Sequence, residues 1–378
     1  MKGKGVPKVG LIVNPIAGIG GAKALKGSDG QLADRAICLG AKPSAVRRAA
    51  TALQSLRGRF VESGAEPPEI LTCFGTMGQT SLLISEYGNW HAVYSHESSK
   101  SAALDTEIAA GCIESLGAEM IIFAGGDGTL RDVQKGLRLD TPVLGIPCGV
   151  KMYSGVFIER PEILGAAFQE YVESGYATYS RAMLDYEAQD TPSGMRSFGQ
   201  VRTPSVRSLQ NSKEVIEEEE DYRGEIADYF VERMETSKHY IFGTGSTVKE
   251  IVRRLGKVTN FLGVDIFRGR TLLKEDATDS DINALFEKTA PEDIYIVVTP
   301  LGGNGFIFGR GNQQITSGAL RKIPRENVII VSPPGKLRSI DAVRTDTGDE
   351  ELDRKFGGIV EVIKGYNIRA LVKSNPEV

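Results

Sequence analysis

Three glycines surround a single carboxylate in the stretch Gly-Gly-Asp-Gly-Thr, residues 125–129. The stretch follows the apolar run 120–124 directly, and a helix-like pattern continues after it. Because glycine has no Cβ, Gly125, Gly126 and Gly128 allow positive φ and let the backbone approach a ligand closely. Free amides and the positive end of a helix dipole at such a turn suit a phosphate group.

The carboxylate of Asp127 has the wrong charge for simply holding a phosphate. In a phosphate site it would contact Mg²⁺ or accept the proton of an attacking hydroxyl, so the turn points to phosphoryl transfer. Thr129 and Asp132 have the spacing of a helix start, with Thr129 as the predicted N-cap. The alternative is a tight turn between strand and helix in which Asp127 only caps the loop.

Two further glycine-rich loops follow apolar runs in the first half of the chain. Within residues 9–21 an apolar run ends at Asn14-Pro15, and a glycine-rich loop follows it. Within residues 143–157 an apolar run ends near Pro147, and the second loop follows it. The loops supply the candidate binding residues Asn14, Gly18, Gly20, Gly21, Lys151, Met152 and Tyr153. Lys151 could pair with a phosphate or face solvent, and Met152 and Tyr153 could flank a base or simply pack.

The second half has a loop of the same kind within residues 241–256, where a short apolar run is followed by Gly-Thr-Gly-Ser-Thr and a helical pattern. This order is similar to the phosphosugar-binding loops of ribose-5-phosphate isomerases. Its candidate phosphate-binding residues are Gly243, Thr244, Gly245, Ser246 and Thr247. A capped turn without a ligand is the alternative. The later run 301–314 could likewise line a site through Arg310 and Asn312, or form a plain hairpin.

Short apolar runs must position these loops, and longer segments of helical period separate them. The predicted strands are 9–13, 69–74, 91–94, 120–124 and 142–146, then 239–242, 261–267, 294–298 and 327–331. Strands without polar alternation that are separated by helices indicate a parallel sheet covered on both faces. Ligands of such sheets bind beyond the carboxyl ends of the strands. The clearest predicted helix is 99–116, with Leu104, Ile108, Cys112 and Leu116 on its apolar stripe.

We therefore predict an α/β protein of two domains. Residues 1–158 form a doubly wound, parallel-sheet, nucleotide-binding domain, and residues 159–378 form an atypical α/β or mixed α+β domain that selects the acceptor. The C-terminal segment of the second domain could pack back on the first. Between the two series of strands, 191–208 has turn composition and is predicted as a loop or irregular β structure. The acidic run 217–221 lies near the start of a helix that ends around Arg233.

Composition narrows the classes of partner. The 378 residues carry a net charge of −4, which argues against nucleic acid or an anionic membrane as the main partner. Four scattered cysteines and three histidines give no disulfide framework and no metal-ligand pattern, so we predict no metal-ligating side chains and a cytoplasmic protein. The apolar run at residues 9–13 is too short for a signal peptide or a membrane span.

The ordered set of motifs resembles the ATP-NAD kinase family, in particular its branch with archaeal members and acetoin-catabolism X proteins. The motifs are NP-x-AG-x-GG in the first loop, GGDGT, the segment PVLGIPCGVKMYS, then FLGVDIF, VVTPLGGNGFIFGRGNQQ and DTGDEELD. GGDGT alone also occurs in diacylglycerol and sphingosine kinases. Those kinases often continue with Asn-Glu, whereas Arg131-Asp132 stands here, which argues against a lipid substrate.

The resemblance implies a kinase that phosphorylates the 2′-hydroxyl of NAD with ATP or polyphosphate and Mg²⁺. It implies that Asp127 is the catalytic carboxylate and that Gly125, Gly126, Gly128 and Thr129 cradle phosphates. The family's asparagine-glutamate pair for the acceptor has no clear counterpart, and Asp185 and Glu187 stand about where it falls.

The strand-loop-helix order at 241–256 departs from ordinary NAD kinases, so other acceptors remain open. The alternatives are a kinase of a polyol, phosphosugar or nucleoside, and a nucleotide-binding regulator without turnover. A homo-oligomer is possible in each case.

Overall fold

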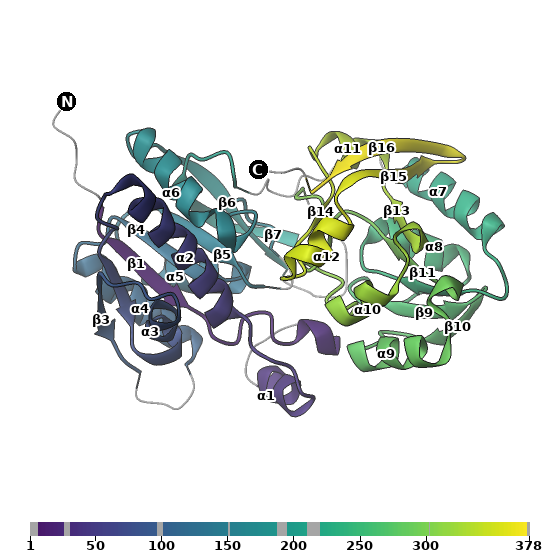
Figure 1. Cartoon of the computed structure of the whole chain (residues 1–378), viewed down its shortest axis with the longest axis horizontal. Coiled ribbons are helices and arrows are strands. Elements are labelled where there is room, and N and C mark those ends of the chain that lie inside the picture. The colour runs from purple at the N-terminus through teal and green to yellow at the C-terminus, as the bar shows by residue number, and fades with distance from the viewer. Residues whose placement is uncertain are drawn as a thin grey trace.

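The computed structural model describes residues 7–25, 31–96, 101–149, 152–186, 195–209, 220–301 and 303–375. Two halves lie side by side, each built around its own β-sheet (Figure 1). The first half contains the N-terminal elements through the hairpin-like pair β6 and β7. The second half begins with α7 and ends with the last strand, β16.

The first sheet has five parallel strands in the order β3-β2-β1-β4-β5. Its strands are β1 (Val9–Val13), β2 (Ile70–Cys73), β3 (Trp90–Tyr94), β4 (Met120–Gly125) and β5 (Val143–Pro147). Every residue of β1, β2, β4 and β5 is buried, as the apolar runs predicted. The predicted parallel sheet is confirmed, with strand ends that differ by one residue or so.

Helices cover both faces of this sheet. The helices of the first half are α1 (Gln31–Cys38), α2 (Ala45–Ser63), α3 (Gln79–Ile84), α4 (Ala103–Ser115), α5 (Asp127–Gly136) and α6 (Leu164–Glu173). One hydrophobic core joins α2 and α6 to the sheet, and another joins α4 and α5 to the opposite face. The doubly wound arrangement is therefore confirmed.

The predicted apolar stripe of the helix at 99–116 is wrong. Leu104 is 62% exposed and Ile108 is 44% exposed, and Leu116 lies just after the end of α4 and is also exposed. The face that packs against the sheet and α5 consists of small and β-branched residues, among them Ala109, Ala110 and Ile113. Alanine is only weakly hydrophobic, so the larger leucine and isoleucine side chains dominated the apolar periodicity from which the stripe was predicted.

The segment predicted as a loop or irregular β structure is largely regular. Strand β7 (Met195–Pro204) pairs antiparallel with β6 (Thr178–Tyr186) along most of their length, with one irregularity in register. Residues 191–194 lie outside the described residues. The pair and α6 lie against the first sheet although they follow residue 158. The boundary at 158/159 stays a prediction.

The second sheet has seven strands in the order β10-β9-β8-β11-β13-β15-β16. The strands of this half are β8 (His239–Phe242), β9 (Asp265–Arg268), β10 (Thr271–Lys274), β11 (Ile294–Val298), β12 (Phe306–Phe308), β13 (Val328–Val331), β14 (Arg344–Thr345), β15 (Gly358–Gly365) and β16 (Ile368–Ser374). The helices are α7 (Glu220–Arg233), α8 (Ser246–Arg254), α9 (Asp279–Lys288), α10 (Ser317–Lys322), α11 (Pro334–Arg338) and α12 (Glu350–Lys355).

Strands β8, β11, β13 and β15 run parallel, and β9, β10 and β16 add antiparallel edges, so the sheet is mixed. The predicted strand at 261–267 is only partly correct, because β9 begins at Asp265 and Gly263 lies in a turn before it. The hairpin that was one alternative for 301–314 is limited to a single antiparallel bridge between Leu301 and Phe306, and β12 pairs in parallel with β14, which brings Phe306 next to Arg344. The second domain is thus a mixed α/β unit.

Candidate active site

The crevice of the first sheet is set by its strand order. From β1 the chain builds outward through β2 to β3, then returns to the centre and builds the other side through β4 and β5. The order therefore reverses between β1 and β4, and this switch point is where open α/β sheets bind ligands. The loop with Asn14 leaves β1 and the turn with Asp127 leaves β4, so two of the predicted glycine loops meet at this crevice.

The carboxylate of Asp127 is buried at the start of α5 and is 4% exposed. Its Oδ2 accepts a hydrogen bond from the amide of Tyr153 at 2.6 Å, and its Oδ1 accepts one from the amide of Ser154 at 3.1 Å. These bonds tie the turn after β4 to the segment after β5. Each carboxylate oxygen keeps a second lone pair, so a further donor can still bind.

Burial raises the pKa of Asp127 to about 7. Hydrogen bonds from Ser154 and from the Tyr153 amide oppose this rise because they favour the ionised form, and the negative charge of Asp185 adds to it. A carboxylate with this pKa can exchange a proton near neutral pH, as a general base must.

Asn14 and Thr129 lie together across the crevice. The side-chain amide of Asn14 donates to Thr129 Oγ1 at 3.0 Å, and the Asn14 Oδ1 accepts from the amide of Ile16. The predicted N-cap role of Thr129 is wrong, because α5 begins two residues earlier, after Gly126 in an extended conformation. Asp132 lies further along α5 and pairs with Lys135 at 3.2 Å.

The glycines of the first two loops have different surroundings. Gly18 has φ +73°, and a Cβ there would lie 2.1 Å from the carbonyl oxygen of Cys148, so no other residue fits. A Cβ on Gly125 would collide with the side chain of Thr129, whereas a Cβ on Gly128 would meet nothing within 4 Å. Gly128 therefore borders open space. Gly20 and Gly21 form the start of a short 3₁₀ turn, Gly21–Lys23.

The loop after β5 joins the crevice to the space between the halves. The amides of Cys148 and Gly149 both donate to the carbonyl of Gly125, at 2.9 and 3.1 Å. Met152 is buried against the core that holds α4 and α5, and Tyr153 is half-buried. The predicted phosphate partner Lys151 lies outside the described residues.

Asp185 lies on β6 close enough to Asp127 to influence its pKa. It pairs with Arg131 Nη1 at 3.1 Å, and the guanidinium of Arg131 lies over the ring of Phe198, 3.9 Å from its centroid. The structure thus brings Asp185 near the Asp127 turn, and its acceptor-binding role stays a prediction. Glu187 lies outside the described residues.

The Gly-Thr-Gly-Ser-Thr loop leaves β8 and starts α8, in the predicted strand-loop-helix order. Internal acceptors already occupy its first three amides. Gly243 donates to Val297 O at 2.8 Å, Thr244 donates to Asn312 Oδ1 at 2.7 Å, and Gly245 donates to Phe261 O at 3.3 Å. Ser246 and Thr247 form the first turn of α8. Asn312 is 1% exposed and holds this loop instead of facing a ligand.

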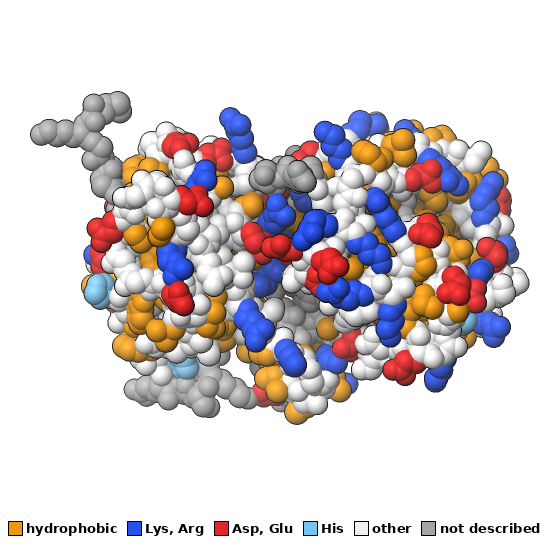
Figure 2. Space-filling model, viewed as in Figure 1, with side chains coloured by type: hydrophobic (Ala, Val, Ile, Leu, Met, Phe, Trp, Pro, Cys, Tyr) orange, Lys and Arg blue, Asp and Glu red, His pale blue; other side chains and the backbone are white. Residues whose placement is uncertain are grey.

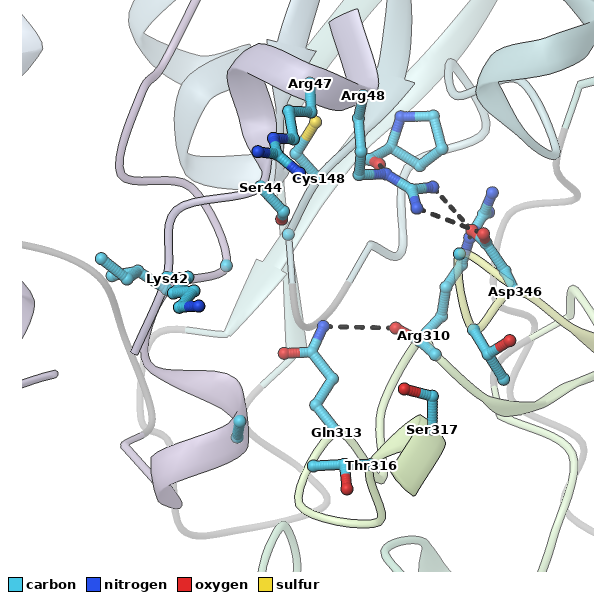
Figure 3. A pocket seen from close by; sticks show the side chains of 18 of the residues that line it. Lys42, Ser44, Arg47, Arg48, Cys148, Arg310, Gln313, Thr316, Ser317 and Asp346 are labelled. Carbon is cyan, nitrogen blue, oxygen red and sulfur yellow. Dashed lines mark hydrogen bonds and ion pairs between the residues drawn. The ribbon is translucent and has the colours of Figure 1, made fainter. Parts of the chain in front are cut away.

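A cavity of about 750 Å³ lies between the two halves. Its walls include Gly18, Cys148, Gly149 and Met152 from the glycine loops of the first half, and Asp127 and residues 243–247 are not among its lining residues. Lys and Arg side chains stand along the junction of the halves in the surface view (Figure 2). Lys42, Ser44 and Arg47 face Gln313, Thr316 and Ser317 across the cavity (Figure 3).

A buried ion-pair cluster joins the halves at one wall of this cavity. Arg48 of α2 holds Asp346 in a two-pronged contact, with N–O distances of 3.2 and 2.6 Å, and Arg310 Nε donates to the same carboxylate at 3.1 Å. The two guanidinium groups hold the pKa of Asp346 down to about 2. We predicted Arg310 as a possible site residue but did not predict Arg48 or Asp346. The DTGD motif containing Asp346 was the available signal.

The described residues do not form a protein-held metal site. No group of three or more His, Cys, Asp or Glu side chains in this part of the chain is placed to hold an ion. Asp127 binds two amides and Asp185 binds Arg131, so neither is a ready-made ligand pair for Mg²⁺.

The switch point of the sheet and the basic cavity are features of an α/β protein that binds phosphorylated ligands. Comparison with known families identifies it further. The N-terminal domain model of ATP-NAD kinases matches residues 9–176, and the C-terminal domain model of ATP-NAD kinases matches residues 237–374. The chain belongs to the ATP-NAD kinase family and is a kinase-type phosphotransferase. The second half, whose strand-loop-helix order at 241–256 we described as a departure from ordinary NAD kinases, therefore also matches the family.

No curated protein and no solved structure gives a significant match to the chain. Within the described residues, none of the helices has the length and apolar character that crossing a membrane requires.

Proposed function

We propose that this protein transfers a phosphoryl group from ATP or polyphosphate to the adenosine 2′-hydroxyl of NAD, giving NADP. The observation that carries the proposal is the match of both ATP-NAD kinase domain models, in order, along one chain whose GGDGT turn lies at the β1/β4 switch point. Among the described residues no helix could span a membrane, and the net charge of the chain is −4. Both observations are compatible with a small-molecule substrate.

In this proposal Asp127 accepts the proton of the attacking hydroxyl. The hydroxyl oxygen forms the new bond to phosphorus, the bond from phosphorus to the bridging oxygen of the donor breaks, and the shortened donor leaves with that oxygen. The amides of Tyr153 and Ser154 fix the orientation of the carboxylate. Because Gly128 borders open space, the acceptor can approach the turn on that side.

Phosphate groups of the donor and acceptor would lie beyond the carboxyl ends of β1, β4 and β5. Asn14, Gly18, Gly20, Gly21, Gly126 and Thr129 are the proposed contacts at this edge. Mg²⁺ bound to the donor would neutralise phosphate charge.

The direct test is incubation of the full chain with NAD, Mg²⁺ and either ATP or polyphosphate, followed by chromatographic detection of NADP. We expect NADP with at least one donor, and product with only one of them identifies the donor. A panel of polyols, phosphosugars and nucleosides is assayed in parallel. Efficient phosphorylation of one of these, without NADP formation, would reject NAD as the acceptor. Tight nucleotide binding without transfer to any acceptor would instead support a regulator.

A further inference from the structure

Arg131 occupies a defined place beside the Asp127 turn. It is the first residue of the Arg131-Asp132 pair that stands where lipid kinases often have Asn-Glu, and it lies on α5 four residues after Asp127. Side chains four residues apart on a helix lie on the same face. Arg131 Nη1 donates to Asp185 Oδ2 on β6 at 3.1 Å, and the guanidinium lies over the ring of Phe198 on β7, 3.9 Å from its centroid. One side chain therefore joins α5 to both strands of the β6–β7 pair.

A second connection joins the carboxylate of Asp127 to the same strand. The amide of Ser154 donates to Asp127 Oδ1 at 3.1 Å, and the amide of Leu184 on β6 donates to Ser154 Oγ at 2.9 Å. Ser154 is fully buried, so these bonds are shielded from water. Leu184 directly precedes Asp185 in the chain. The serine therefore fixes Asp185 relative to Asp127 by a route that does not pass through Arg131, and the two routes close a ring.

Three elements place charged side chains around Asp127 and Asp185. Asp185 itself belongs to β6, Arg131 comes from α5, and β7 places Arg196 opposite Asp185 in the strand register. The loop after β1 contributes the uncharged Asn14, through its bond to the first turn of α5. The negative charge of Asp185 adds to the rise in the pKa of Asp127 that burial causes. A cation held on Asp185 offsets that contribution.

The ion pair is better suited to controlling charge than to stabilising the fold. The side chains of Arg131 and Asp185 are 35% and 26% exposed, and pairs with this exposure contribute little to stability because water screens them. Asp127, by contrast, is 4% exposed. A charge acts more strongly on a buried group than on an exposed one, because less water lies between them. The pair should therefore affect the ionisation of Asp127 more than it affects unfolding.

We propose that Arg131 is a positioning residue for the general base: it fixes the carboxylate of Asp185 beside the Asp127 turn and offsets the charge of that carboxylate. The proposal rests on the proposed function for the role of Asp127 as the base. With Arg131 in place, Asp127 reaches its ionised, proton-accepting form at a lower pH than it would beside Asp185 without this cation. Phe198 keeps the guanidinium in its orientation, since the face of an aromatic ring attracts a cation.

The pH dependence of kcat/KM for NADP formation tests the proposal, because its acidic limb reports the ionisation of the base in the free enzyme. We expect Arg131→Gln to move this limb to higher pH by about 0.5–1 pH unit, since it removes a cation and leaves the charge of Asp185 without it. Asp185→Asn should move the limb to lower pH, because it removes the anion. A purely structural role of Arg131 would lower activity at every pH and leave the limb in place, and that result would overturn the proposal.

Two further variants separate the ion pair from the charge of the helix. Arg131→Lys keeps the positive charge and should restore the limb to near its position in the unaltered protein. Lys135→Gln is the matched control, because it removes the same charge from α5 one turn further on, where Lys135 pairs with Glu107 of α4 at 2.9 Å. It should leave the limb unchanged, and a shift as large as that of Arg131→Gln would refute the role of the pair. Thermal unfolding checks the fold of each variant, and Asp185→Asn carries the test if Arg131→Gln does not fold.

Direct titration of Asp127 in the full chain without ligand distinguishes failure of this inference from failure of the proposed function. Aspartate carboxyl carbons are labelled for nuclear magnetic resonance, and the Asp127 signal is the one that Asp127→Asn lacks. Its midpoint should rise in Arg131→Gln and fall in Asp185→Asn. These two shifts without any NADP formation would keep the charge coupling and reject NAD kinase activity. NADP formation with the same midpoint in all variants would reject the role of Arg131 and leave the kinase activity.

Discussion

Asp127, in the turn after β4, and Asp346, at the junction of the halves, are both buried carboxylates. The pKa of Asp127 lies above the ordinary value of an aspartate, and the pKa of Asp346 lies below it. Burial raises the pKa of Asp127 to about 7, and two arginines hold the pKa of Asp346 down to about 2. Uncharged donors of Tyr153 and Ser154 bind Asp127, whereas charged guanidinium groups hold Asp346. The sign of the neighbouring charge therefore decides the outcome, because burial alone raises the pKa of both.

This difference assigns different tasks to the two regions. A carboxylate whose pKa lies near neutrality can take up and release a proton during a reaction, which suits the switch-point turn. A carboxylate held ionised between two arginines cannot, but it can join two parts of a protein. Substitution of either residue should therefore affect a different property of the molecule.

The largest expected effect is on turnover. We expect Asp127→Asn to lower kcat by a factor of ~10²–10⁴, the usual contribution of a general base. Asparagine has the size of aspartate but cannot accept the proton. Its side-chain NH₂ would face one of the two backbone donors, so a small loss of stability is also expected. Steady-state NADP formation measures the first effect, and circular dichroism with thermal unfolding measures the second.

Asp127→Glu serves as the companion variant, since it keeps a carboxylate with a longer side chain. We expect it to retain more activity than Asp127→Asn. Full turnover by a folded Asp127→Asn protein would remove Asp127 from the reaction and leave it as a structural residue of the turn.

The next effect is on stability at the junction. Asp346→Asn should destabilise the protein by about 3–5 kcal/mol at neutral pH, because it leaves Arg48 and Arg310 buried without their counter-charge. Urea unfolding measures the loss. Glu361→Gln is the control, because its pair with Arg369 is half-exposed on the surface and should contribute only about 0–1 kcal/mol. Equal losses in the two variants would mean that the junction cluster is no stronger than a surface pair.

The two carboxylates should also give stability opposite pH dependences. The folded pKa of Asp127, about 7, lies above its ordinary value of 3.8, so its contribution to stability is full below pH 3.8 and is lost as pH rises through 7. The folded pKa of Asp346, about 2, lies below 3.8, so its contribution is present above pH 3.8 and is lost as pH falls through 2.

Between pH 5 and 8 the unaltered protein should therefore lose on the order of 2–4 kcal/mol through Asp127, and Asp127→Asn should lack this part of the slope. Urea unfolding at several pH values measures it. The kcat/KM of the unaltered protein should rise over the same interval as Asp127 ionises. Identical pH slopes for the two proteins would mean that Asp127 titrates at its ordinary value.

Most of the strands could be predicted from the sequence, because strands that are buried on both faces, such as Val9–Val13, appear as continuous apolar runs. The face of α4 was wrong because its packing depends on alanines, and the cap at Thr129 was wrong because α5 begins two residues earlier, after Gly126. The motif around Asp127 pointed to the crevice. No local pattern could predict the pairing of Arg48 with Asp346, since it joins positions 298 residues apart.

The smallest expected effect comes from two glycine-to-alanine substitutions, one beside the proposed substrate site and one far from it. Gly128 and Gly58 both lie in helices, and a Cβ on either meets nothing within 4 Å. Alanine at either position should stabilise the protein by about 0.5–1 kcal/mol, because it lowers the entropic cost of forming a helix. If substrate approaches the backbone at Gly128, Gly128→Ala should in addition raise the KM for a nucleotide, while Gly58→Ala should not. Both variants are measured by thermal unfolding and NADP formation. Equal KM values would mean that the space beside Gly128 is open to solvent alone, and the acceptor would then have to reach Asp127 from the side of β5.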